Sequence, residues 1–390
     1  MTANAAPAAT GSTPTPSTPA PSTPTGPPLS GPPPASGSVL ASSMLAASPY
    51  LQAVRGNRPE VCPVWFMRQA GRSLPEYRAL RSGRTFDQMI LDPALAAEVT
   101  LQPVRRHHVD AAILFSDIIT PAASVLPGVT IEAGRGPVIP EPIRTHQQLD
   151  LLRAYDPGTH TPFVAEAVRL ATAELTPAGV PLIGFAGAPF TVATYLIEGG
   201  KSKEFANTKA MMHGDPDLWF ALADALADMA LRSLRAQIEA GASAVQLFDS
   251  WAGVLSEADY RRFVLPSSAR VFAGLADLGV PRAHFGVATG ELLGAMADAG
   301  ADIVGVDWRV PLDVARERTG PRVVLQGNLD PVLLTHVPWP VVEGRVREIL
   351  DEAARAGGGH VFNLGHGVLP ETDPATLTRV VELVHRISRG

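Results

Sequence analysis

The sequence has little cysteine, no long apolar run and no surplus of positive charge. Cys62 is the single cysteine, so the chain forms neither an internal disulfide nor a thiolate-rich zinc or iron–sulfur site. No apolar stretch approaches the roughly 18 residues that are needed to span a bilayer. The formal net charge of -6 lacks the basic excess that general nucleic-acid binding requires. These features predict a cytoplasmic protein with neither a membrane span nor a nucleic-acid partner.

The amino-terminal segment lacks charge altogether, because the first charged side chain of the chain is Arg55. It consists almost wholly of Pro, Ser, Thr, Ala and Gly, which provide too little apolar bulk to offset the entropy of ordering the backbone. It also lacks the features of a secretory signal or a mitochondrial presequence. We therefore predict that residues 1–47 are a disordered tail and residues 48–390 are one folded domain.

Eight short apolar runs follow, separated by segments of helical period. Such runs indicate a parallel sheet that is covered by helices on both faces, and eight repeats match a (β/α)₈ TIM barrel. A doubly wound open sheet is the alternative, although no G-x-G-x-x-G turn follows the first run. The predicted strands are 61–67, 111–117, 181–187, 244–250, 282–289, 301–307, 322–328 and 360–366.

Between these runs, residues 216–241 and 339–357 have the pattern of helices, and the second segment ends in a glycine. The long interval after the second run contains Gly and Pro turn signals within SVLPGVTIEAGRGPVIPEPI, which predict a β-hairpin.

Polar residues stand where most of the predicted strands end, and in a barrel this end carries the active site. An isolated Asp or Thr there is usually the N-cap of the next helix, and we expect that role for Thr289, Asp307 and Asp330. The other candidates are Arg68, Arg72, Asp117, Asp249, Ser250, Asn328 and His366.

Arg68 and Arg72 flank Gly71 in the sequence FMRQAGRSLPEYR, residues 66–78. Two guanidinium groups at this spacing suit the oxygens of carboxylates or phosphates. A surface loop that forms ion pairs with Glu76 or with aspartates elsewhere is an equally good reading of the spacing alone.

Asp117 closes the apolar run AAILFSD, so its carboxylate is predicted to be desolvated and to need a partner. A buried structural salt bridge is the alternative role. Ser250 lacks the preceding glycine of a nucleophile elbow, and the histidines show no metal-ligand spacing. The glycines that follow the last strand leave a sugar-phosphate enzyme as a second reading on fold grounds.

Six motifs in one order resemble the uroporphyrinogen decarboxylase family. The resemblance runs from about Ser48 to the carboxyl terminus, and Ser73 is a departure, because many relatives have tyrosine there. The motifs are FMRQAGRSLPEYR (66–78), FSD (115–117), GFAGAPFTVATYLIEGG (184–200), QLFDSWAG (246–253), GNLDP (327–331) and NLGHGVLPETDP (363–374).

The resemblance implies a (β/α)₈ barrel, usually homodimeric, that decarboxylates the four acetate arms of uroporphyrinogen III to give coproporphyrinogen III. It implies no metal and no organic cofactor. It places catalysis on Asp117 and Arg68, with Asp117 accepting the pyrrole N–H groups of the tetrapyrrole. The substrate contacts that it implies are Arg68, Gln69, Ala70, Gly71, Arg72, Asp117, Tyr195, Ser250 and His366.

Two other functions fit the same fold. A related branch of cobamide-dependent methyltransferases activates thiols on zinc, but Cys62 alone supplies few of the ligands that such a site needs. A non-catalytic porphyrin carrier is the third reading, against which the joint presence of Arg68, Arg72, Asp117 and Tyr195 argues.

Overall fold

The computed structural model describes residues 43–132 and 136–389. The predicted disorder of residues 1–42 lies outside this range. Residues 43–47 lie inside it: residues 43–46 are helical, and the Ala46 carbonyl accepts a hydrogen bond of 2.7 Å from Gln52 Nε2. The described structure thus begins five residues before the boundary that the composition predicts.

Seven parallel strands form one curved sheet in the order β1-β4-β5-β6-β7-β8-β9, and each neighbouring pair is parallel. All seven lie within the predicted strand segments, although each is shorter than its segment. Strand β6 ends early because Ala288 adopts a φ of 57°, outside the extended region. The strands are β1 (Ala112–Ile113), β4 (Leu182–Gly187), β5 (Ala244–Asp249), β6 (Arg282–Gly286), β7 (Ile303–Gly305), β8 (Val324–Gln326) and β9 (His360–Val361).

The predicted first strand, 61–67, is wrong as a regular strand but fills the eighth position of the sheet. Val64 forms a parallel bridge with Phe362, and the Phe362 N–H donates to the Pro63 carbonyl at 2.8 Å. On the other side, the Asp110 N–H donates to the Val64 carbonyl at 2.8 Å, just before β1. Pro63 has no N–H, so it interrupts regular pairing. The sheet closes, which confirms the barrel and excludes the open alternative.

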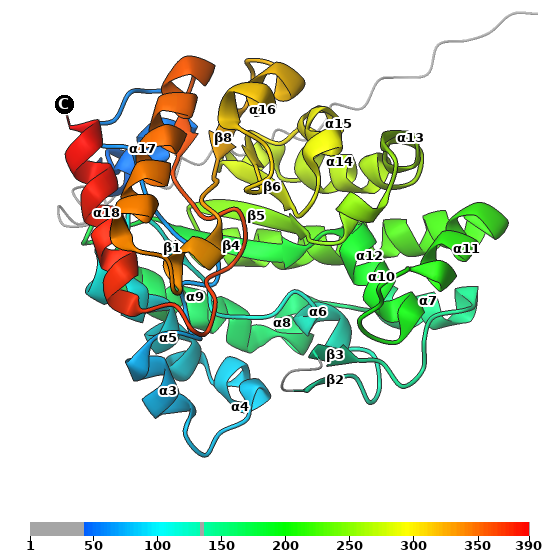
Figure 1. The fold of residues 1–390 in the computed structure, drawn as a ribbon. Coiled ribbons are helices and arrows are strands. Elements are labelled where there is room, and N and C mark those ends of the chain that lie inside the picture. Colours follow the sequence, from blue (N-terminus) through cyan, green and yellow to red (C-terminus); the bar gives the residue numbers. More distant parts are fainter. Residues whose placement is uncertain (1–42, 133–135, 390) are drawn as a thin grey trace, which may run out of the picture.

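Helices surround the closed sheet (Figure 1), and at least one follows each strand position. The two predicted helices and the predicted hairpin are confirmed, with bounds that differ by at most two residues for the helices. The covering helices are α5 (Pro93–His107), α9 (Pro162–Leu175), α10 (Pro189–Glu198), α12 (Pro216–Glu239), α14 (Leu265–Ala273), α15 (Leu293–Asp298), α16 (Leu312–Thr319), α17 (Trp339–Ala356) and α18 (Pro374–Ser388).

Shorter elements join these helices, and none of the helices in the described ranges is long and apolar enough to cross a bilayer. Figure 1 shows α3, α4 and the hairpin together at the lower edge of the barrel. The shorter elements are α2 (Pro49–Val54), α3 (Pro75–Arg81), α4 (Phe86–Leu91), α6 (Thr120–Ala123), α7 (Leu149–Arg153), α8 (Pro157–His160), α11 (Ala206–Gly214), α13 (Glu257–Asp259), and the hairpin strands β2 (Thr130–Glu132) and β3 (Gly136–Val138).

The barrel interior is packed with side chains that alternate along the strands, as the two-residue period of a strand requires. Residues of the intervening positions face the helices and join the outer clusters. The interior cluster includes Trp65, Met67, Ile113, Ile183, Ala244, Ala283, Phe285, Ile303, Val324 and Val361.

Helix α2 closes the amino-terminal end of the barrel. Its Tyr50 and Leu51 belong to the interior cluster, and the Ala53 carbonyl lies so near Gly359, before β9, that a Cβ there would approach it to 2.6 Å. In the described structure, α2 leaves the opposite end of the barrel, where the strands terminate, uncovered.

A chain of polar side chains crosses the barrel interior. Trp65 Nε1 donates to Gln326 Oε1 at 3.0 Å, and Gln326 Nε2 donates to Gln246 Oε1 at 2.9 Å. All three side chains are buried. They link the first strand position to β8 and β5, so they fix which strands lie across from one another.

We expect Gln326→Leu to destabilise the fold by about 2–4 kcal/mol, because it leaves both the Trp65 N–H and the Gln246 carbonyl unpaired in the interior. Thermal unfolding measures this as a lower Tm. Val332→Thr, at an exposed position, is the control. A Tm equal to that of the control would show that the hydrogen bonds of Gln326 contribute nothing to stability.

Candidate functional site

The loop that follows the first strand position has an unusual backbone. Arg68 has a φ of 60°, Gly71 of 104° and Arg72 of 29°. Glycine adopts such angles freely, but the two arginines adopt them at a cost in free energy. Strained residues of this kind persist only where the surrounding structure holds them, and they concentrate at functional sites.

Gln69 holds this loop in place. Its side chain is buried, with Oε1 accepting from the Phe66 N–H at 2.9 Å and Nε2 donating to the Ala111 carbonyl at 3.0 Å. Gln69 was predicted to contact the substrate, but its side chain forms hydrogen bonds inside the fold. These bonds tie the arginine loop to Ala111, the residue before β1. Ala70 is half-buried and packs against the hydrophobic cluster that includes Tyr77 and Phe115.

Neither Arg68 nor Arg72 forms an ion pair within the residues that the structure describes. Glu76, the partner that the surface-loop reading requires, pairs instead with Arg106 at 2.5 Å. Both arginines are accessible to water. Desolvation and the charge of Arg72 nevertheless lower the pKa of Arg68, while Asp117 opposes them.

Asp117 lies close to Arg68, at the end of the segment that continues β1. Its Oδ1 accepts from the Ile119 N–H at 2.9 Å, which fixes the carboxyl group. Burial raises the pKa of Asp117, and the Ile119 N–H and the Arg68 charge only partly oppose that rise. The buried salt bridge that the sequence left open is not formed, since no arginine of the described chain lies within ion-pair distance. The carboxylate thus needs further donors to ionise easily.

His366 lies on the other side of Arg68, between two glycines. A Cβ at Gly367 would come within 2.8 Å of Arg68 Cγ, so the glycine makes room for the arginine. Burial and the charges of Arg68 and Arg72 lower the pKa of His366 to about 4. Its Nδ1 accepts from the Gly367 N–H at 2.6 Å, so the neutral ring carries its proton on Nε2. His366 is therefore a neutral hydrogen-bond donor.

Tyr195 enters the same region from α10. Its ring meets the edge of Trp251, with centroids 6.0 Å apart. Burial raises the pKa of Tyr195, and the nearby Asp117 adds to this. The electrostatic contacts join Tyr195, Asp117 and Arg68 into one group, and Arg72 and His366 complete it. We call these five residues the strand-end cluster.

Aromatic rings from three strands lie at the same end of the barrel. Phe248 meets Phe185 and Phe285 edge to face, with centroids 5.5 and 6.1 Å apart. Phe185 and Phe248 are only half-buried, so they border a space that water reaches. Apolar surface beside the strand-end cluster lowers the local dielectric and strengthens the fields of its charges.

Ser250 is at the end of β5 and is half-buried, but no contact of the described side chains joins it to Arg68 or Asp117. Its neighbour Asp249 is buried and accepts from Thr191 Oγ1 at 2.8 Å. Thr191 in turn accepts from the Trp251 N–H at 3.2 Å. These bonds fix the Ser250–Trp251 turn against α10, so Asp249 has the structural role that its position allowed.

The three expected N-caps differ in outcome. Asp330 is confirmed, because its Oδ1 accepts from the Val332 N–H at 3.0 Å. Thr289 occupies the N-cap position of a short helix but makes no capping bond. Asp307 is not a helix cap: it binds the backbone of Ala288 and Arg309 and the Arg309 side chain. The expectation for Asp307 was therefore wrong, because Pro311 occupies the N-cap position of α16.

Trp308 is a site neighbour that motif reasoning missed. Its ring contacts His366, with centroids 6.4 Å apart, and Gly365 lies against its backbone. The signal was present in the sequence, since Trp308 directly follows the strand-end aspartate in GVDWR.

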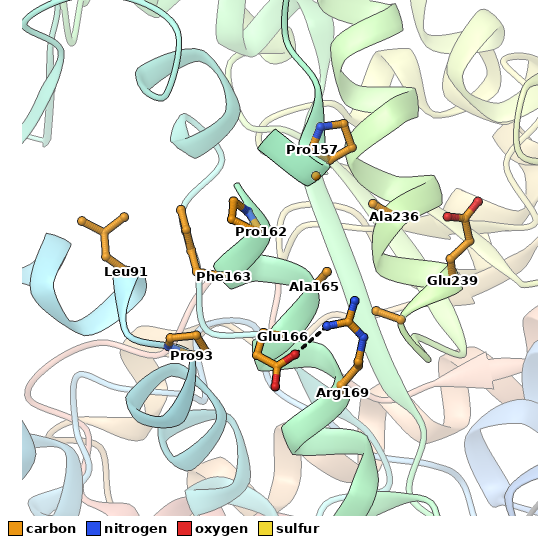
Figure 2. A pocket seen from close by; sticks show the side chains of 12 residues that line it. Leu91, Pro93, Pro157, Pro162, Phe163, Ala165, Glu166, Arg169, Ala236 and Glu239 are labelled. Atoms are coloured by element: carbon orange, nitrogen blue, oxygen red, sulfur yellow. Dashed lines mark hydrogen bonds and ion pairs between the residues drawn. The ribbon is translucent and has the colours of Figure 1, made fainter. Parts of the chain in front are cut away.

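A separate cavity of about 710 Å³ lies outside the barrel, between α5, α8, α9 and α12 (Figure 2). Its charged lining includes Glu166 and Arg169, which pair with each other at 2.5 Å. This cavity shares no residue with the strand-end cluster. Among the described residues, no group of three or more His, Cys, Asp or Glu side chains is placed to hold a metal ion.

Ionising Asp117 costs stability, because folding raises its pKa. The penalty is absent below the pKa of the unfolded carboxyl and grows as pH rises through the folded pKa. We therefore expect Asp117→Asn to have a higher Tm than the parent chain at pH 7, and the difference to shrink towards pH 4.

Asp156→Asn is the matched control, since its carboxylate caps α8 and hydrogen bonds from Thr159 lower its pKa. It should lower the Tm at pH 7. An Asp117→Asn variant that behaves like this control would show that Asp117 is not desolvated in the folded chain.

Most of the chain matches a single protein family. The family model described as uroporphyrinogen decarboxylase matches residues 45–387. A relative from Salinispora tropica named uroporphyrinogen decarboxylase is 59% identical over 341 residues, covering 87% of this chain and 91% of that protein. A relative of the same name from Rhodococcus erythropolis is 57% identical over 344 residues, covering 87% of this chain and 96% of its own length.

Among solved structures, a methyltransferase from Methanosarcina mazei superposes with a TM-score of 0.71. It is 19% identical and covers 87% of this chain and 98% of its own. At that identity the likeness supports the fold alone.

Proposed function

The chain belongs to the uroporphyrinogen decarboxylase family, and we propose that the strand-end cluster is where it carries out that reaction. The activity removes CO₂ from the four acetate arms of uroporphyrinogen III and gives coproporphyrinogen III, a step of heme biosynthesis. One observation supports this site above the others: two arginines that form no ion pair with any described residue lie beside a desolvated carboxylate.

We assign Asp117 to bind the pyrrole N–H groups at the centre of the substrate. The four pyrrole N–H groups of a porphyrinogen point towards one another, and a single carboxylate can accept hydrogen bonds from several of them. The raised pKa of Asp117 supports this role, because the Ile119 N–H and the Arg68 charge only partly stabilise the anion. The substrate N–H groups supply these donors, and the anion in turn stabilises positive charge that develops on the ring.

Arg68 and Arg72 are assigned to the carboxylates of the substrate arms. Uroporphyrinogen carries eight carboxylates, whereas the protein has a formal net charge of -6, so local positive charge must hold the ligand. Guanidinium groups bind carboxylates through two parallel hydrogen bonds. Both arginines meet that need because no protein carboxylate of the described chain competes for them.

The remaining cluster residues, His366 and Tyr195, are assigned as hydrogen-bond donors. The Nε2–H of His366 suits a propionate oxygen, since the ring is neutral and its tautomer is fixed by Gly367. Tyr195 is assigned to Asp117 or to a carboxylate. Gly71 and Ala70 contribute backbone beside the arginines, Gln69 contributes by holding their loop, and Ser250 lies at the rim.

The proposed chemistry uses the substrate ring as its own electron sink, with no cofactor and no metal. A proton adds to a pyrrole carbon next to nitrogen and leaves an iminium cation. The bond between the acetate methylene and its carboxylate then breaks, CO₂ leaves, and the electron pair neutralises the iminium. A second proton then converts the exocyclic methylene to a methyl group, and the first proton leaves the ring carbon, which restores the pyrrole with a net uptake of one proton for each CO₂ released. The depressed pKa of Arg68 supports it as the first proton donor.

Asp117→Asn tests the central role. It keeps the shape and the bond from Ile119 but removes the charge, so turnover of uroporphyrinogen should fall on the order of 10²-fold or more. The release of coproporphyrinogen from purified, metal-stripped protein is the measurement. Near-normal turnover would remove Asp117 from the mechanism.

Arg72→Lys tests planar recognition. Lysine keeps the charge but lacks the planar guanidinium that donates two parallel hydrogen bonds. We therefore expect kcat/KM for uroporphyrinogen to fall about tenfold. Arg84→Lys, in the exposed turn before α4, should leave kcat/KM unchanged. Full activity of Arg72→Lys would refute two-point binding of a carboxylate.

The same proposal extends to assembly and location. We assign a homodimer, as the sequence resemblance implies, and a cytoplasmic site of action, which agrees with a single cysteine whose burial raises its pKa to about 12. Such a thiol is largely unreactive at neutral pH.

A further inference from the structure

Arg309 is an arginine near the strand-end cluster to which the resemblance gives no role. It follows β7 in the sequence Asp307-Trp308-Arg309. Its guanidinium carbon lies 3.9 Å from the centre of the Trp308 ring, and its Nη1 donates to Asp307 Oδ2 at 2.8 Å. A cation–π contact and an ion pair together hold the guanidinium in one position, although its side chain is 49% exposed.

Trp308 connects Arg309 to the cluster. The Trp308 ring contacts the His366 ring, with centroids 6.4 Å apart. A Cβ at Gly365 would lie 2.9 Å from Trp308 Cα, so only glycine permits this approach. Gly367, two residues on, accommodates Arg68 in the same way. Arg309, Trp308, His366 and Arg68 thus form a continuous row along one side of the rim.

Arg309 also retains unused donors. Within the described chain its guanidinium has one hydrogen-bond partner, Asp307, which leaves Nε and Nη2 for a ligand. A cavity of about 320 Å³ borders it, whose lining includes Ala288, Glu291 and Arg318. There is accordingly space beside the guanidinium for a group of carboxylate size.

The simpler role for Arg309 is to neutralise a buried aspartate. Asp307 is indeed almost fully buried, but its two oxygens already accept backbone N–H bonds from Arg309 and Ala288. Such bonds stabilise a carboxylate without a countercharge. Neutralisation also leaves unexplained why the guanidinium carbon lies over the ring of a tryptophan that contacts His366.

We propose that Arg309, positioned by Trp308 and Asp307, binds a propionate carboxylate of the tetrapyrrole at the rim. This inference rests on the proposed function for the identity of the ligand. A propionate fits better than a reacting acetate, because pairing with a cation stabilises a carboxylate against loss of CO₂. Propionates persist through all four steps, so this contact holds substrate, intermediates and product alike.

Arg309→Gln is the test, and Arg322→Gln is the matched control. Arg322 loses the same charge but precedes β8, at the opposite end of the barrel, and is 81% exposed. Loss of a charge-assisted hydrogen bond should raise the KM for uroporphyrinogen about tenfold in Arg309→Gln. The kcat should change less than about twofold, since the contact is equal in ground and transition states.

A binding measurement separates this inference from the proposed function. Calorimetric titration with coproporphyrinogen, under anaerobic reducing conditions, should give a Kd raised by the same factor as KM. Arg309→Lys retains the ion pair with Asp307 and should give an intermediate Kd, and it carries the test if Arg309→Gln does not fold.

Equal Kd and KM values in Arg309→Gln and Arg322→Gln would overturn the inference while leaving the proposed function intact. A fall in kcat without a change in Kd would also overturn it, since Arg309 would then act on the reacting group. If the parent chain binds the tetrapyrrole but does not turn it over, the proposed function fails, and the ratio of the two variants' Kd values still decides the role of Arg309.

Discussion

The site depends on the closure of the barrel between its first and last strand positions. Val64 bridges to Phe362, and the Met67 carbonyl accepts from the Val368 N–H at 2.8 Å. These few bonds bring together segments that lie some three hundred residues apart in the chain. Without them the arginine loop and the glycine-flanked histidine would follow different edges of an open sheet, and no cluster would form.

Closure also explains how the protein tolerates strain and unpaired charge at this end. Arg68 and Arg72 have positive φ values, and neither has a protein carboxylate within ion-pair distance in the described residues. Gln69 offsets part of this cost by anchoring the loop to residue 111, on the next strand position. The packed interior and the polar chain through Gln326 supply the rigidity that holds the site in its costly arrangement.

The sequence was informative where a feature is local. Apolar runs and helical periods located the strands and helices, because these patterns reflect burial of neighbouring residues. The spacing of Arg68 and Arg72 indicated an anion site, but it could not exclude ion pairs with Glu76. Only the position of Arg106, thirty residues further on, decides that question.

Features that depend on contacts between distant segments were not predictable in this way. Asp307 was expected to cap a helix, because an aspartate at a strand end usually does, whereas its oxygens bind Ala288 in the loop after β6 and Arg309 in its own loop. Trp308 gained meaning only when Gly365 placed His366 against it. The irregular pairing of residues 61–67 likewise follows from Pro63, whose effect on a strand depends on which neighbour it faces.

The cluster combines opposite charges in an order that can orient a large ligand. Burial raises the pKa of Asp117, while the charges of Arg68, Arg72 and Arg309 act together on His366. A protonated His366 would add a fourth positive charge to that group, and this repulsion helps to keep the ring neutral. A tetrapyrrole has the complementary pattern, with N–H donors at its centre and carboxylates at its periphery. Under the proposed function, this field therefore favours one orientation of the ligand, with the ring nitrogens towards Asp117 and the arms towards the arginines.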